Sequence, residues 1–182
     1  MANVIKFTAV ELSELQKSLI EKIRALKKQK QAVILCHNYQ RPEIYEVADF
    51  VGDSLELCKK ARTTDAKMII FCGVYFMAES AAVLNPRMKV VVPSREAGCA
   101  LSDMITAERL RRVKAEHPDA GVVCYVNSTA AVKAESDICC TSGNAARVVN
   151  SLPGNEVIFI PDQFLGQNVA RETGKTVYTH PG

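Results

Sequence analysis

The sequence predicts an α/β protein made of two copies of one αβα unit, each with a parallel sheet between layers of helices. The first observation is a repeat: an apolar run that ends in polar residues occurs at 32–39 (AVILCHNY) and again at 121–128 (GVVCYVNS). A second pair of similar segments follows, KMIIFCGVYFMAES at 67–80 and NEVIFIPDQFLGQN at 155–168. The expected strands are also short, apolar and without alternation, which is typical of parallel sheets covered on both faces.

The N-terminal segment predicts an amphipathic helix. Leucine and isoleucine side chains recur at helical spacing between Leu12 and Leu26, and Thr8 and Glu11 fit a capping box. We therefore expect a helix over residues 9–29 that forms an N-terminal arm packed on the first unit.

Turn and cap residues delimit the other elements. Pro42 suits a first helical turn, Asp53 or Ser54 can cap the following helix, and Asn85-Pro86 ends another. In the first unit we expect strands at 32–36, 67–72 and 89–92 and helices at 42–49, 55–63 and 77–84. After a helix that begins at Thr106, we expect strands at 121–126, 137–140, 156–160 and 176–179 and helices at 129–134, 143–151 and 164–173.

These elements divide the chain into three regions. Residues 1–30 form the helical arm, residues 31–104 the first αβα domain and residues 105–182 the second. The first copy ends in Gly98-Cys99, whereas the second stops at Gly182, just before a matching cysteine would be due. The repeat therefore suggests a chain that is cut short.

Composition excludes several classes of protein. The 182 residues are 48% hydrophobic and 24% charged, as in soluble globular proteins, and a net charge of +3 is too small to indicate a nucleic-acid partner. No segment has the length of a signal peptide core or a membrane span, so we expect a cytoplasmic protein without a membrane partner. Seven cysteines in that compartment do not indicate disulfides.

The polar residues with catalytic potential follow the expected strands. Ligands of parallel α/β sheets bind beyond the carboxyl ends of the strands. His37 and Tyr39 follow the first strand, and a histidine–tyrosine pair can exchange protons with a substrate. The alternative is a histidine that only satisfies backbone groups. Tyr125 and Asn127 occupy a similar place in the second copy and favour the functional interpretation.

Two serines begin helices in equivalent parts of the repeat. Ser54 and Ser142 lie where a helix N-terminus offers unpaired amides to a carboxylate or phosphate. Each serine can bind such a ligand or merely cap its helix, and the sequence leaves both roles open.

Cysteines fall into two groups. Cys99 follows a glycine after an expected strand, so it is either a metal ligand or a buried thiol. The remaining six lie in apolar strands or helices, and we expect them to belong to the core: Cys36, Cys58, Cys72, Cys124, Cys139 and Cys140.

Long ordered motifs in the chain resemble a known family. They are CHNYQRPEI, VADFVGDS, GVYFMAES, EAGCALSDM, YVNSTAAVKAESDICCTSGNA and FIPDQFLGQNVA, and they resemble quinolinate synthase, the A protein of de novo NAD biosynthesis. The resemblance runs from about residue 30 to the end of the chain. It implies three pseudo-symmetric αβα domains around a central site, of which this chain carries two.

The resemblance also implies a reaction and a cofactor. Members of the family condense iminoaspartate with dihydroxyacetone phosphate to give quinolinate, with a 4Fe–4S cluster held by one cysteine from each domain. It implies a functional link to L-aspartate oxidase. A chain with one cluster ligand of three is then expected to be inactive by itself.

The motifs assign roles to individual residues by resemblance. Cys99 is the implied cluster ligand, His37 and Tyr39 the implied acid–base residues, and all site residues are expected to face one cleft. The implied substrate-binding residues are His37, Ser54, Tyr125, Asn127 and Ser142. The alternative functions are a non-catalytic binding module for a small phosphorylated or dicarboxylic metabolite and a purely structural domain.

Overall fold

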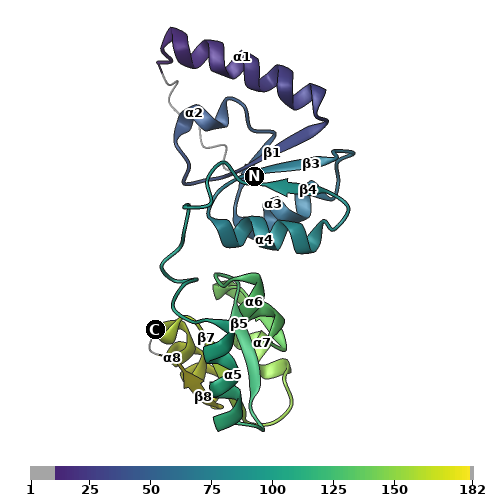
Figure 1. The fold of residues 1–182 in the computed structure, drawn as a ribbon. Helices are drawn as coiled ribbons and strands as arrows, with labels where there is room; N and C mark the ends of the chain where they lie inside the picture. Colours follow the sequence, from purple (N-terminus) through teal and green to yellow (C-terminus); the bar gives the residue numbers. More distant parts are fainter. Residues whose placement is uncertain (1–10, 181–182) are drawn as a thin grey trace. The chain divides into compact units, whose positions relative to one another are not determined.

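The computed structural model describes residues 11–180, and these residues form two compact units divided between Ala97 and Gly98. Each unit contains a four-stranded parallel sheet with helices on both faces, which confirms the three-layer α/β fold that the sequence predicts (Figure 1). Among the described residues, no helix has the length and hydropathy needed to cross a membrane.

The first unit opens with a long helix and builds its sheet in the order β2-β1-β3-β4. Helices α1 and α2 cover one face of this sheet and α3 and α4 cover the other (Figure 1). Its elements are α1 (Glu14–Gln29), β1 (Ala32–His37), α2 (Pro42–Tyr45), β2 (Phe50–Gly52), α3 (Ser54–Ala61), β3 (Met68–Cys72), α4 (Tyr75–Leu84) and β4 (Lys89–Val91).

The second unit repeats this plan, with strand order β6-β5-β7-β8. Helices α5 and α6 pack on one face of the sheet, and α7 and α8 pack on the other. Its elements are α5 (Ala107–Glu116), β5 (Gly121–Tyr125), α6 (Ala130–Ala134), β6 (Ile138–Cys140), a 3-10 turn η1 (Ser142–Asn144), α7 (Ala145–Ser151), β7 (Glu156–Ile160), α8 (Gln163–Thr173) and β8 (Thr176–Thr179).

Two details of the first unit differ from the sequence expectations. The capping box of α1 is formed by Ser13 and Gln16, whereas the expected one at Thr8 lies outside the described residues. Residues 50–52 form the edge strand β2, which sequence analysis did not predict. The segment ends in a glycine and lies outside the longer apolar runs that predict the equally short strands β4 and β6, so its pairing with β1 defines it.

In both units, an aspartate just before the edge strand forms two hydrogen bonds with the backbone of the neighbouring strand. The carboxylate of Asp49 accepts the backbone N–H of Ile34 at 2.8 Å, while the Asp49 N–H donates to the Ile34 carbonyl at 2.9 Å. Asp137 makes the same pair of bonds with Val122, at 2.7 and 3.0 Å. Each aspartate thus extends the ladder by one side-chain bond just before the edge strand begins.

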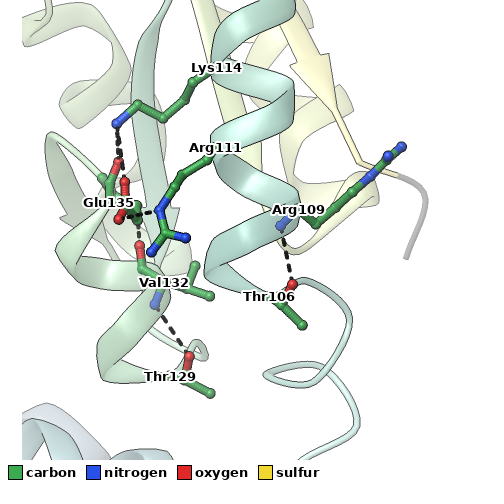
Figure 2. Close-up of polar contacts among 8 residues, drawn as sticks. Thr106, Arg109, Arg111, Lys114, Thr129, Val132 and Glu135 are labelled. Atoms are coloured by element: carbon green, nitrogen blue, oxygen red, sulfur yellow. Dashed lines mark hydrogen bonds and ion pairs between the residues drawn. The ribbon is translucent and has the colours of Figure 1, made fainter.

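In each unit, a lysine of the helix that precedes the first strand donates a hydrogen bond to the backbone just before the edge strand. Lys27 of α1 donates to the carbonyl of Val47 at 2.9 Å, and Lys114 of α5 donates to the carbonyl of Glu135 at 2.8 Å. Figure 2 shows Lys114 reaching toward Glu135 together with Arg111, which lies 2.8 Å from its carboxylate. The helix α1 therefore matches α5 in its contacts and is an integral helix of the repeated unit.

Candidate functional site

The register of the strands defines which residues of the two units are equivalent. Cys36 of β1 pairs with Val51 of β2, and Cys124 of β5 pairs with Cys139 of β6. One position further, His37 pairs with Gly52 and Tyr125 pairs with Cys140. Tyr125 therefore occupies the position of His37.

The alignment expected from the sequence is wrong by one residue. Matching 32–39 with 121–128 places Ala32 opposite Gly121, whereas the strand register places Val33 there. As a consequence, Asn127 corresponds to Tyr39, and Ser142 corresponds to Ser54. Apolar runs without alternation carry no signal that distinguishes these two alignments, whereas hydrogen bonding between strands does.

In the first unit, His37 is the last residue of β1, and Tyr39, two residues further on, lies beside it. Their ring centroids are 4.0 Å apart with the planes tilted by 39°. The Nδ1 atom of His37 accepts the backbone N–H of Tyr39 at 3.4 Å. In the neutral imidazole the hydrogen then resides on Nε2, which makes that nitrogen the donor toward a ligand.

Burial lowers the pKa of His37 below its ordinary value, and the carboxylate of Asp53 opposes this shift. Burial has this effect because a less polar environment disfavours the charged imidazolium. His37 is thus held in its neutral form near pH 7.

Tyr39 connects the end of β1 with the start of α4. Its hydroxyl oxygen accepts the backbone N–H of Val74, the N-cap residue of α4, at 3.0 Å. The hydroxyl hydrogen points to the thioether of Met77 at 3.9 Å, which is a weak acceptor. A ligand oxygen would be a better acceptor, so this contact leaves Tyr39 suited to donate to a substrate.

The start of α3 shows which residue caps the helix. The side chain of Asp53 accepts the backbone N–H of Glu56 at 2.8 Å and is the N-cap. Ser54 is the first helical residue and does not perform this role. The capping alternative for Ser54 is thereby removed, although its contact with a ligand stays a prediction.

In the second unit, Tyr125 is the last residue of β5, and it is partly buried near acidic side chains. Burial raises the pKa of its hydroxyl, and the nearby acidic groups of Asp162, Cys140 and Cys99 add to the shift. Tyr125 is therefore a neutral hydrogen-bond donor over the physiological range. Asp162, which caps α8 by accepting the N–H of Leu165 at 2.9 Å, was not singled out by sequence analysis.

The segment after β5 is held by a buried serine. The hydroxyl of Ser128 donates to the carbonyl of Tyr125 at 2.9 Å, and its side chain is fully buried. Asn127, directly before it, is half-buried. A tight turn thus fixes both Tyr125 and Asn127 at the carboxyl edge of the sheet.

Ser142 lies at the first position of η1, one residue after the N-cap Thr141. The backbone N–H of Thr141 donates to the side chain of Asn144 at 2.7 Å, which closes the turn. Ser142 is exposed, and, like Ser54, it follows the cap and does not form it.

Cys99 begins a turn in the segment that connects β4 to α5. Its carbonyl accepts the backbone N–H of Ser102 at 2.9 Å and the Ser102 hydroxyl at 3.0 Å. The Cys99 residue is partly exposed, whereas Cys36, Cys58, Cys124 and Cys140 are buried. A partly exposed thiol on a fixed turn fits a metal or cluster ligand, although residues 11–180 contain no group of three metal-binding side chains.

The expectation that all six remaining cysteines belong to the core is wrong for Cys139, which is exposed, and Cys72 is only partly buried. Cys139 lies on an edge strand of three residues, and an edge strand has a neighbour on one side only. The apolar surroundings in the sequence do not reveal this exposure.

The structure therefore gathers the expected site residues within each unit. In the first unit, His37 ends β1, and Tyr39 and Ser54 follow β1 and β2. In the second unit, Tyr125 ends β5, and Asn127 and Ser142 follow β5 and β6. That they share one cleft with Cys99 stays a prediction, because it concerns the arrangement of the two units.

Two repeated parallel α/β units with hydroxyl, imidazole and amide groups at the strand ends place the chain in the class of parallel α/β proteins, whose ligands bind beyond the carboxyl ends of the strands. The family model described as quinolinate synthetase A protein matches residues 21–182, and the chain belongs to this family.

Curated relatives agree with this membership. The chain is 58% identical over 161 residues to a quinolinate synthase of Dehalococcoides mccartyi, which covers 88% of this chain and 53% of that protein. It is 56% identical over 164 residues to quinolinate synthase 2 of Methanosarcina acetivorans, and the match covers 90% of this chain and 53% of that protein. For quinolinate synthase of Aquifex aeolicus the identity is 52% over 167 residues, covering 92% and 51%. The chain thus spans about half the length of the curated relatives it matches.

Proposed function

We propose that this chain supplies two αβα units of a quinolinate synthase, a cytoplasmic enzyme of NAD biosynthesis. The proposed reaction condenses iminoaspartate with dihydroxyacetone phosphate, with loss of phosphate and water. The observation that carries the proposal is family membership over residues 21–182, together with the polar groups at equivalent strand ends of both units.

The first-unit residues are proposed to move protons. His37 presents its Nε2–H to a substrate oxygen, because Nδ1 is engaged by the Tyr39 backbone N–H. Tyr39 gives and takes a proton at its hydroxyl oxygen, which the Val74 N–H holds in place at 3.0 Å. Together the two groups serve the keto–aldo isomerisation that the condensation requires.

The remaining site residues are proposed to hold the substrate. Tyr125 donates from a neutral hydroxyl whose pKa is raised by burial, and Asn127 can donate and accept through its amide. Ser54 and Ser142 contribute hydroxyls directly after helix caps, where they can bind carboxylate or phosphate oxygens.

We further propose that Cys99 is one ligand of a 4Fe–4S cluster whose other ligands lie outside the described residues. A cluster held by three thiolates supplies an open iron position that acts as a Lewis acid on a substrate oxygen. Since Cys99 is the one ligand assigned here, the 182-residue chain alone is expected to form no quinolinate. L-aspartate oxidase, which would supply the unstable iminoaspartate, is the proposed functional partner.

The test uses a chain of the relatives' full length, purified without oxygen and given dihydroxyacetone phosphate and enzymatically generated iminoaspartate. Quinolinate formation supports the proposal. Binding of either substrate without product would instead indicate the non-catalytic binding module.

A matched pair of variants tests the cluster ligand. Cys99→Ala should abolish iron content and visible absorbance, whereas Cys58→Ala should retain both, because Cys58 is buried in α3. A cluster that survives in the Cys99 variant would remove this residue from the ligand set.

A further inference from the structure

Two cysteines of the second unit face each other across neighbouring strands. Cys124 of β5 and Cys139 of β6 are register partners in the parallel sheet. Adjacent strands lie about 4.7–4.9 Å apart, which falls inside the Cα separation of about 4.4–6.8 Å that a disulfide requires. Register partners also place their side chains on the same face of the sheet, so the two thiols are neighbours.

The two thiols differ in access to solvent. Cys139 is exposed on the short edge strand, whereas Cys124 is fully buried. An oxidant therefore reaches Cys139 first. Cys124 is then the neighbouring thiol that can form a disulfide with the oxidised Cys139.

The electrostatics of the pair match this division of roles. A hydrogen bond from the Cys124 thiol lowers the pKa of Cys139 to about 7, and the positive charge of Lys133 acts in the same direction. The same interaction, together with burial, raises the pKa of Cys124. Because the thiolate is the nucleophilic form, Cys139 is the thiol that reacts first at neutral pH. The Cys139 thiolate charge is one cause of the raised pKa of Cys124, and oxidation of Cys139 to a neutral sulfenic acid removes it.

We propose that Cys139 and Cys124 form a redox-active dithiol, in which a hydroperoxide oxidises Cys139 and Cys124 then closes a disulfide between β6 and β5. The Cys139 thiolate attacks the terminal oxygen of the peroxide, the O–O bond breaks and the S–O bond of a sulfenic acid forms; the second oxygen leaves as hydroxide or alkoxide and takes a proton to become water or alcohol. The Cys124 sulfur then attacks the Cys139 sulfur and gives up its proton, and the sulfenic oxygen leaves as water. In sum, two thiols lose two electrons and the peroxide gains them.

The first unit contains a comparison pair at an equivalent position. Cys36 occupies the place of Cys124, but its register partners are Val51 and Cys72, and Cys72 lies on the inner strand β3. Burial and the neighbouring Cys72 raise the pKa of Cys36 to about 12, and burial raises the pKa of Cys72 as well. This second pair has the geometry for a disulfide but lacks an exposed, ionised thiol.

The disulfide would act on the segment that leads to the second-unit site. Cys139 is followed by Cys140, Thr141 and Ser142, and Cys124 is followed by Tyr125. A bond between β5 and β6 fixes the edge strand from which Ser142 extends. The redox proposal does not depend on the proposed catalytic function, because its readout is a covalent bond.

The experiment treats the reduced 182-residue chain with one to a few equivalents of hydrogen peroxide at pH 7, followed by alkylation, trypsin digestion and mass spectrometry. Cleavage at Lys133 separates the two thiols into peptides 115–133 and 134–147. We expect a linked 115–133/134–147 species, with fragment ions that assign the bond to Cys139, before peptides 31–59 and 68–87 become linked through Cys36 and Cys72.

Three variants make the test decisive. Cys139→Ser, at an exposed position, should abolish the linked species, whereas Cys140→Ser should retain it. In Cys124→Ala, alkylation of Cys139 at pH 7 should slow about tenfold, because the thiolate fraction returns to that of an ordinary thiol. Linkage of Cys36 to Cys72 first, or oxidation of Cys139 without linkage to Cys124, would overturn the proposal.

Discussion

Removing the carboxylate of Asp137 should destabilise the second unit by a predictable amount. In Asp137→Ala the backbone N–H of Val122 loses the acceptor that it reaches at 2.7 Å. Val122 is 1% exposed, and a buried N–H without a partner costs about 1–3 kcal/mol. Because Asp137 itself is exposed, water can partly replace the carboxylate, so we expect about 1–2 kcal/mol.

The effect should appear in two measurements. Urea unfolding should give a free energy of unfolding lower by about 1–2 kcal/mol, and the melting temperature of a unit of this size should fall by about 4–8 °C per kcal/mol. Hydrogen exchange at the Val122 amide should accelerate by about 5–30-fold if the amide is protected through this bond.

Matched variants separate this bond from general effects. Asp137→Asn keeps an acceptor oxygen and should lose less than half as much, whereas Asp119→Ala, in an exposed turn, should lose almost nothing. Asp49→Ala in the first unit should lose more than Asp137→Ala, because Asp49 also pairs with Lys27 at 2.9 Å. An unchanged free energy of unfolding in Asp137→Ala, together with unchanged protection of Val122, would refute the reasoning.

Three further predictions follow from the site and its supports. Gly166→Ala should destabilise the second unit by about 1–3 kcal/mol, because the added Cβ would lie 2.6 Å from a side-chain methyl of β8, whereas Gly143→Ala has open space and should be neutral in thermal melts. Tyr39→Phe in a full-length enzyme should slow quinolinate formation by about two to four orders of magnitude and cost about 1 kcal/mol of stability; near-normal turnover would remove it from the mechanism. Since folding lowers the pKa of His37, its unfolded form binds more protons, so stability should fall as the pH drops from the ordinary histidine value toward the lowered one, and His37→Gln should lose this dependence in pH-resolved unfolding.

The sequence by itself determined the architecture. Short apolar runs without alternation, separated by helix-like segments with turn residues, predict parallel sheets covered on both faces, and both sheets have this form. The strands at 156–160 and 176–179 were predicted to the residue, because their bounding Gly, Pro and Asn residues are strong local signals. Long motifs also sufficed to indicate the family.

The strand register decided which residues of the two units are equivalent. Hydrogen bonding between β1 and β2 shows that residues 50–52 form a strand. Comparison with the pairing of β5 and β6 shows that Tyr125 occupies the position of His37. Such pairings join segments far apart in the sequence, and a run of apolar residues is compatible with more than one register.

Tertiary structure likewise decided the partners of individual side chains. The link from Tyr39 to the N-terminus of α4, the aspartate bonds to Val122 and Ile34, and the contact between Cys124 and Cys139 all cross between elements. Local sequence fixes which residues form a strand or helix, because backbone preferences act over a few residues. It does not fix which side chains meet across a sheet, because that depends on how distant segments pack.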